Sequence, residues 1–327
     1  MQIRKLNFKY IIVLAGLFVL PFCSVAQTIY AKADAKYDGI KRIEIEGRFT
    51  DVNIIGGDRD DVQFKGLIQG KIWGSKDFEI KHRQDGSTLK VWVEMPRSIS
   101  GRFEAYLNFK VPYSMDIEII NSSGDMYIED IISDNMKLKA SSGDIELKNI
   151  ETNLTTTTSS GDLKIEYLKG SISAVSTSGD QSFSHIQADI STRATSGDMF
   201  FIDVKGNLIT KTTSGDLKFE DINGALSNVS SSGNLTIRNA KTVLDLMATS
   251  GDIRGEGIEL LGDSKFTSTS GNVTMDFEND MDALSFDLRA SSGDLHAGQR
   301  SAERKLYAKH GEIWVYGHST SGDQSYH

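Results

Sequence analysis

Hydrophobic and polar positions alternate along most of this chain, and between residues 141 and 252 the pattern recurs at a constant interval. Each period carries the tripeptide Ser-Gly-Asp, or once Ser-Gly-Asn. Successive central glycines of these tripeptides, called here the marker glycines, are eighteen positions apart: Gly143, Gly161, Gly179, Gly197, Gly215, Gly233 and Gly251. A constant period of this length is typical of stacked repeat architectures.

Apolar side chains stand two, four, seven and eleven residues after most marker glycines, as in Ile145, Leu147, Ile150 and Leu154. The step of two between the first pair indicates a strand, not a helix. Beyond the fourth position the residues become small and hydroxylated, which suits a strand beside a narrow interior. The residues expected to point into that interior are Thr156, Thr158, Ala174, Ala194, Thr210 and Ala248.

These patterns predict an all-β fold, a parallel β-solenoid with 18-residue coils in which two short strands and two tight corners complete one turn. The alternative is an antiparallel hairpin in each unit, which would show paired turn signals about nine residues apart. In this chain only one corner is invariant. There Gly supplies a positive φ, and Asp or Asn is expected to accept a hydrogen bond from the backbone N–H two residues on. The second corner, near Asn149, Asp203, Asp221 and Asn239, follows a looser pattern.

The N-terminus has the pattern of a secretory signal peptide, in which three basic residues precede the apolar stretch from Ile11 to Leu20. That stretch is too short for a comfortable membrane span. Cleavage after Ser24-Val25-Ala26 would remove Cys23, the only cysteine. An uncleaved anchor and lipidation of Cys23 are the alternatives. The chain is therefore expected in the periplasm, on the outer-membrane surface or outside the cell, without a transmembrane helix after cleavage.

The spacing divides the chain into a signal peptide over residues 1–26, a tether over 27–39, an irregular β-region over 40–120 that caps the solenoid, and the solenoid repeats over 121–327. Toward the C-terminus the marker spacing widens, to twenty positions at Gly271 and to twenty-two at Gly293. Gly311 then follows at the original spacing, and Gly322 comes after a much shorter interval.

Composition narrows the range of partners. The 327 residues are 39% hydrophobic and 25% charged, which is a globular composition. The net charge is −9, and it becomes −12 once the three positive charges of the signal peptide are removed. An acidic chain without a basic stripe is not expected to bind nucleic acid.

The acidic residue after each marker glycine is the first candidate for chemistry. Stacked carboxylates about 5 Å apart repel one another, and a calcium ion would relieve that repulsion. Calcium-binding β-rolls repeat a Gly-rich nonapeptide, however, and two positions of this column hold uncharged Asn. A hydrogen-bonding corner is therefore favoured over a calcium site. The column consists of Asp125, Asp144, Asp162, Asp180, Asp198, Asp216, Asn234, Asp252, Asn272 and Asp294.

Other polar groups do not indicate ice binding, metal binding or catalysis. The outward column fourteen positions after the marker glycines includes Val175, Arg193 and Met247, which are too bulky for a flat ice-binding lattice. Outward charges alternate in sign, as in Lys164 and Glu166, which is typical of a solvated face and not of a glycosidase groove. No pair of histidines has metal-ligand spacing; the six are His82, His185, His296, His310, His318 and His327. The sequence therefore predicts no catalytic residue, no metal ligand and no cofactor, and hence no enzyme.

Four features occur together: the signal peptide, the segment Phe49-Thr50-Asp51-Val52-Asn53-Ile54, the pair Val111-Pro112 before the first coil, and the repeated Ser-Ser-Gly-Asp followed by apolar-polar-apolar residues. In these the chain resembles a family of bacterial β-strand-repeat envelope proteins described as putative adhesins, a domain class of unknown function related to GIN-domain head adhesins. The resemblance covers residues 40–327 and implies no catalytic residues.

From these observations we expect a secreted or cell-envelope β-solenoid that acts as a structural or adhesive binding module. One alternative is a periplasmic accessory protein in envelope stress or signalling, and another is a polysaccharide-processing enzyme. The expected partner is an envelope protein or a surface glycan.

Overall fold

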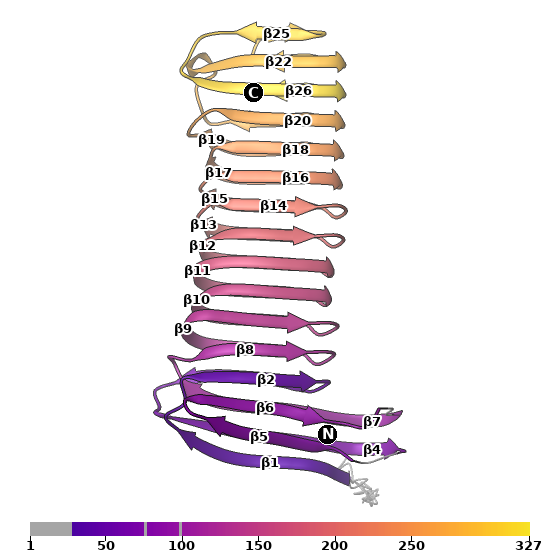
Figure 1. Ribbon diagram of the computed structural model, residues 1–327. Helices are drawn as coiled ribbons and strands as arrows, with labels where there is room; N and C mark the ends of the chain where they lie inside the picture. Colours follow the sequence, from indigo (N-terminus) through magenta and orange to yellow (C-terminus); the bar gives the residue numbers. More distant parts are fainter. Residues whose placement is uncertain (1–27, 75–76, 98–99) are drawn as a thin grey trace, which may run out of the picture.

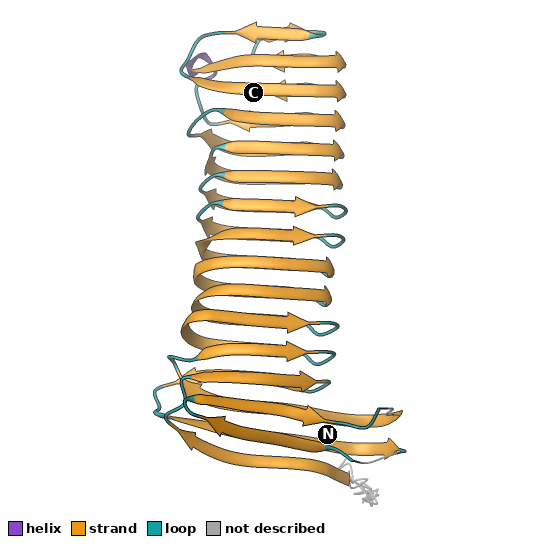
Figure 2. Ribbon diagram, viewed as in Figure 1, coloured by secondary structure: helices purple, strands orange, loops and turns teal. Residues whose placement is uncertain are grey.

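In the computed structural model residues 28–74, 77–97 and 100–327 are described, so the predicted signal peptide lies outside the described residues. The strands belong to one continuous sheet that winds into a tall stack of coils (Figures 1 and 2). Consecutive units pair in parallel with a shift of one repeat, so that Ile145 lies beside Leu163 and Leu163 beside Gln181. The predicted parallel β-solenoid is therefore confirmed, and the hairpin alternative is wrong.

Each coil contributes one strand segment to each of two faces. Face A contains the segments that follow the marker glycines, and face B contains those that follow the second corner. In the first coils one bent strand passes through both faces, and later coils have two separate strands. The bent strands are β9 (Met126–Ala140), β10 (Ile145–Ser160), β11 (Leu163–Ser178) and β12 (Gln181–Ala194). The separate strands are β13 (Met199–Lys205), β15 (Leu217–Asn223), β17 (Leu235–Thr242), β19 (Ile253–Leu260) and β21 (Val273–Phe277) on face A, and β14 (Leu208–Thr212), β16 (Leu226–Ser232), β18 (Leu244–Ser250) and β20 (Ser264–Ser270) on face B.

The second corner is more regular than its sequence pattern suggests. At the sixth residue after the marker glycine the backbone enters the left-handed region, with φ between 52° and 60°. Asn and Asp tolerate this conformation better than most residues, which explains their frequency here. Tyr167 and His185 adopt it as well. The corner residues are Asp130, Asn149, Tyr167, His185, Asp203, Asp221 and Asn239.

The marker glycine is required chiefly because the backbones of neighbouring coils approach closely. A Cβ atom on Gly215 would lie 2.0 Å from the carbonyl oxygen of Gly197, and the other marker glycines face the same conflict. Gly215 also has a φ of +125°, whereas Gly143 and Gly161 lie outside the left-handed region. The predicted positive φ thus holds at only some corners, while the close approach holds at all of them.

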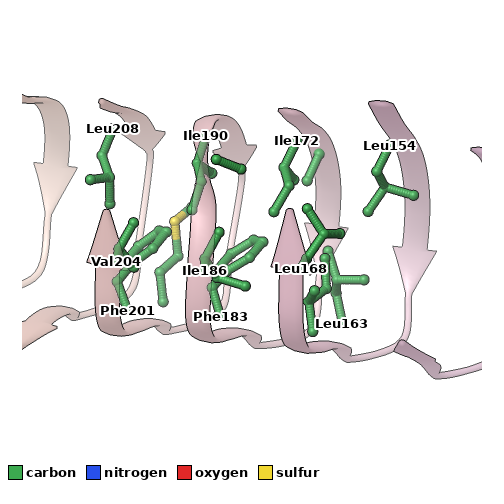
Figure 3. Packing of buried hydrophobic residues seen from close by; sticks show 14 of the residues in the cluster. Leu154, Leu163, Leu168, Ile172, Phe183, Ile186, Ile190, Phe201, Val204 and Leu208 are labelled. Carbon is green, nitrogen blue, oxygen red and sulfur yellow. The ribbon is translucent and has the colours of Figure 1, made fainter. Parts of the chain in front are cut away.

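The four predicted apolar columns fill the interior (Figure 3). Phe183, Phe201 and Phe219 stack in adjacent coils with ring centroids 5.0 and 4.9 Å apart and planes within 6° of parallel. The labelled residues of Figure 3 are each at most 2% exposed. The small residues predicted to face the interior are each at most 3% exposed, namely Thr156, Thr158, Ala174, Ala194, Thr210 and Ala248.

At the N-terminal end the order of the coils departs from the order of the chain. The coil of β2 (Arg42–Arg48) and β3 (Asp51–Gly57) lies between two later segments. On one side β2 and β3 pair in parallel with β8 (Asp116–Asn121) and β9. On the other side they pair in parallel with β6 (Thr88–Glu94) and β7 (Ser100–Pro112). Both faces of the solenoid therefore continue into this region.

Antiparallel strands close the N-terminal end. β1 (Thr28–Asp38) pairs with β4 (Asp61–Trp73), β4 pairs with β7, and β5 (Glu79–Asp85) pairs with β6. The sequence predicts a tether over residues 27–39, yet residues 28–38 form β1 because Ala33 and Tyr37 pack against the core. Such closing strands protect the open edge of a parallel stack from pairing with other chains.

The C-terminal end shows the same departure from chain order. β26 (Ile313–Ser321) lies between β20 and β22 (Leu284–Ser292) on face B (Figure 1). β27 (Gln324–Tyr326) lies between β21 and β23 (Leu295–Ala297) on face A. The last segment of the chain therefore lies nearer the middle of the stack than β22 and β23, which precede it in the sequence.

This insertion corrects the order that the marker spacing suggests. Gly322 stacks between Gly271 and Gly293, since their backbones make the close approaches typical of marker glycines. Gly311 stands outside the marker line and faces the carbonyl of Ala283 instead. The regular interval before Gly311 therefore does not mark a further coil, because the chain between residues 298 and 312 turns back in antiparallel strands.

Those strands, β24 (Arg300–Ala302) and β25 (Lys305–Ala308), pair with β23 and β22 and close the end. A short 3-10 helix, η1 (Met281–Ala283), lies in the loop between β21 and β22. Within the described ranges, no helix combines the length and apolar character needed to cross a membrane.

Candidate functional site

The acidic column forms a continuous ladder of hydrogen bonds along one edge of the stack. Each Asp or Asn side chain accepts a hydrogen bond from the backbone N–H of its equivalent in the next coil, with distances of 2.7–3.1 Å. The ladder starts at Asp51, which the sequence analysis missed, and includes Asp323 between Asn272 and Asp294. The predicted bond to the N–H two residues on is wrong, because the next coil presents an equivalent donor.

Asn234 and Asn272 take part in the ladder just as the aspartates do, through their side-chain oxygens. The position therefore requires an acceptor and not a charge, which agrees with the hydrogen-bonding role favoured by the sequence. Across residues 28–74, 77–97 and 100–327, no three His, Cys, Asp or Glu side chains are grouped so that they could hold a metal ion.

A second ladder follows the left-handed corners. Asn149 donates to Asp130 at 3.0 Å, and Asn239 donates to Asp221 at 3.3 Å. Between these pairs, the imidazole of His185 stacks on Tyr167 with centroids 4.7 Å apart, and its Nδ1 lies 2.9 Å from Asp203. His185 is therefore part of a structural column.

The other histidines are dispersed. His82 hydrogen-bonds to Tyr37 and its ring lies 5.5 Å from that of Phe64. His296, His310, His318 and His327 all belong to the C-terminal end, on different segments. The structure does not bring them together as a site.

The outward charges of face A pair both within a coil and between neighbouring coils. Lys164 lies 3.0 Å from both Glu146 and Glu166. On β9, a hydrogen bond between Tyr127 and Glu129 raises the pKa of the tyrosine to about 12 and lowers the pKa of the carboxyl. Such exposed pairs are typical of a solvated face and contribute little individually.

A broad groove of about 620 Å³ lies on face B at the N-terminal end. Side chains from β2, β5, β6 and β8 line it: Glu44, Ile45, Glu46, Arg83, Lys90, Val91, Trp92, Glu118 and Ile120. Sequence reasoning missed it because these strands are far apart in the chain and meet only through the insertion of β2.

The walls of this groove are ion-paired across strands. Arg42 of β2 binds both Glu44, at 2.9 Å, and Glu118 of β8. Lys90 of β6 lies 3.6 Å from Glu44. Beside these pairs, the half-buried Trp92 and the 47% exposed Ile120 lie on either side of Glu46 in the register of the strands. Accessible aromatic and aliphatic side chains beside charged groups are common in protein-binding surfaces.

A second groove, of about 430 Å³, runs along face B beside the left-handed corners. Its rim is a polar column in which Ser171 donates to Asn153 at 2.8 Å and the backbone N–H of Asn207 donates to Asp189 at 2.7 Å. Most of these side-chain acceptors are thus already engaged between coils.

A family model agrees with this fold. The Toastrack DUF4097 family matches the chain over residues 40–199 and 166–323. No curated protein matches it.

Solved structures resemble the chain only distantly. A putative cell adhesion protein from Clostridium sporogenes is 11% identical, with 90% of this chain and 98% of that chain covered and a TM-score of 0.19. A putative lipid binding protein from Parabacteroides distasonis is 10% identical, with 89% and 95% covered and a TM-score of 0.32. A putative adhesin from Parabacteroides merdae is 11% identical, with 90% and 96% covered and a TM-score of 0.23.

Proposed function

We propose a function for this chain, which belongs to the Toastrack DUF4097 family. It is an exported surface module that binds an envelope or cell-surface partner and carries out no catalysis. The β-solenoid supplies a rigid scaffold, because its corner groups bond from coil to coil. Binding would use the outer surface of its faces.

The observation that carries this proposal is the groove over β2, β5, β6 and β8. Two of its three carboxylates, Glu44 and Glu118, are ion-paired with Arg42 and Lys90, and Glu46 alone does not make the pair of acid and base that a hydrolase requires. Trp92 and Ile120 remain accessible beside the ion pairs, and their burial by a partner would drive association. An adhesive role therefore fits this surface better than a chemical one.

The test adds purified protein to cells of the source organism that lack their own copy and measures how much remains bound. Trp92→Ala combined with Ile120→Lys should reduce binding strongly. Leu261→Lys changes a 56% exposed residue directly after β19, a strand that lies far from β2 and β6 in the stack; it is the matched control and should bind like the wild type. Equal binding by all three proteins would contradict the proposal.

Protease treatment of intact cells that carry the native protein distinguishes a surface module from the main alternative, a periplasmic accessory protein. Cleavage of the protein would agree with a surface location. Full protection, with cleavage only after the outer membrane is opened, would favour a periplasmic accessory protein instead.

A further inference from the structure

The C-terminal end carries a cluster of aromatic side chains on the outer surface of face B. The rings of Trp314 and Tyr316 on β26 stack with centroids 5.9 Å apart, and Tyr307 on β25 lies 5.7 Å from Trp314. Tyr307 is 59% exposed and Tyr316 is 40% exposed. Burial does not account for this cluster, because the rings lie on the solvent side of the sheet.

Charged side chains of both signs flank the exposed ring of Tyr316. In the parallel register Tyr316 lies between Lys265 of β20 and Asp287 of β22, and His318 lies beside Arg289. These side chains line a hollow of about 270 Å³ above the backbone of Gly317. The hollow is slightly smaller than the roughly 300–1,000 Å³ of pockets that enclose drug-sized ligands, so it suits a group the size of one sugar ring.

Arg289 has donors available for a ligand. Its guanidinium approaches Asp287 at 3.2 and 3.3 Å, and its side chain is 59% exposed. A guanidinium carries five N–H donors in a planar fork that matches a carboxylate, and these two long contacts use only part of them. Lys265 adds a second cation at the rim of the hollow. Its ammonium forms no ion pair within the described residues, unlike Arg289, which pairs with Asp287.

We propose that this hollow binds an acidic saccharide, with the sugar ring stacked on Tyr316 and its carboxylate held by Arg289 and Lys265. The C–H bonds on one face of a pyranose carry partial positive charge, which the negative face of an aromatic ring attracts. Lys265 and Arg289 outnumber Asp287 in the lining, so the hollow keeps a net positive charge that complements the carboxylate. This site is distinct from the groove over β2, β5, β6 and β8, and it lies at the opposite end of the stack.

The test is a calorimetric titration of the full chain with a galacturonate trimer. The neutral galactose trimer and a triglutamate peptide are the comparison ligands, since the first lacks the charge and the second lacks the ring. We expect saturable binding of the galacturonate trimer that weakens as salt is added, because salt screens exposed charges. The two comparison ligands should bind at least about tenfold more weakly.

Matched variants assign the contacts. Tyr316→Ala should weaken binding about three- to tenfold, whereas Tyr316→Phe should retain it, because the ring makes the contact. Arg289→Gln should weaken binding about tenfold or more. Tyr113→Ala and Arg238→Gln, which change an exposed tyrosine and an exposed arginine elsewhere, should bind like the wild type.

Three results would overturn the proposal: no binding of the galacturonate trimer, equal binding of the neutral trimer or the peptide, or unchanged binding by both Tyr316→Ala and Arg289→Gln. The Trp92→Ala, Ile120→Lys variant keeps this test apart from that of the proposed function. It should bind the saccharide normally even if it no longer binds cells.

Discussion

The middle of the stack and its two ends use the same kind of strand but follow different rules of order. In the middle each coil pairs with the coil that follows it in the chain, and corner groups bond to their equivalents in that coil. At the ends, the coil over residues 42–57 and the segment over 313–326 lie between neighbours that are distant in the chain. Local spacing sets the shape of a coil, and long-range pairing decides where it is placed.

The ends differ because a parallel stack cannot terminate itself. Its last coil exposes unpaired backbone groups, which invite edge-to-edge association. At both ends the chain inserts a coil out of order and then adds antiparallel strands, β1, β4 and β5 at one end and β24 and β25 at the other. The inserted coils tie these closing strands to the middle by pairing with strands that are not their neighbours in the sequence.

The largest expected effect is in the core of the middle. Leu217→Ala combined with Phe219→Ala should lower the free energy of unfolding by about 5 kcal/mol or more, because both side chains are 1% exposed and packed on both sides. Leu306→Ala on β25 should cost about 2 kcal/mol, since this residue lies on the outermost strand of the C-terminal end. Urea unfolding measures both, and equal losses would remove the distinction between middle and end.

The next effect tests the close approach of coils. Gly215→Val should cost more than about 3 kcal/mol, because its Cβ would lie 2.0 Å from the carbonyl oxygen of Gly197 and its φ is +125°. Lys218→Val, at an exposed position on β15 just after this corner, should cost no more than about 1 kcal/mol, including the loss of its contact with the ring of Phe200. Similar melting temperatures for the two variants would contradict this account of the marker glycine.

How far the sequence predicts the fold depends on the region. The repeat period, the apolar columns and the corner at Gly215 follow from local pattern, and the structure confirms them. The position of β2 does not follow, because its corner at residues 48–50 lacks the marker tripeptide. The position of β26 does not follow either, because marker spacing carries no information about which strands pair.

The candidate surfaces were harder to predict for the same reason. The groove contains Glu44, Trp92 and Ile120, which come from separate strands that meet only in the folded order. The aromatic cluster joins Tyr307 and Tyr316 across β22. Exposed aromatic residues near the C-terminus were the available signal, but their side-by-side arrangement depends on the inserted strand.

A smaller effect concerns the acidic ladder. Asp180→Ala should cost about 1 kcal/mol, because the backbone N–H of Asp198 loses its acceptor at 2.8 Å. Asp180→Asn should leave the melting temperature nearly unchanged, as the native Asn234 makes the same bond. If the Asn variant were as unstable as the Ala variant, charge and not hydrogen bonding would explain the column.

The smallest effect is expected at the junction of the middle with the N-terminal end, where Glu129 pairs with Tyr127 and Lys148. The hydrogen bond from Tyr127 lowers the pKa of Glu129 in the folded state. This stabilisation is present above the ordinary carboxyl pKa of about 4.3 and is lost as the pH falls through the lowered value. The difference in melting temperature between wild type and Glu129→Gln should therefore shrink between neutral pH and about pH 3. A difference that stays constant across this range would contradict the assignment.

The most direct test of the stacking order is a disulfide between designed cysteines, in a Cys23→Ser background. Ser270 and Ser321 are register partners on β20 and β26, whereas β26 separates Ser270 from Ser292 of β22. Ser270→Cys with Ser321→Cys should oxidise readily, because adjacent strands lie about 4.8 Å apart. Ser270→Cys with Ser292→Cys should remain reduced in the monomer. Rapid bonding of the second pair and none of the first would place the coils in chain order and contradict the account.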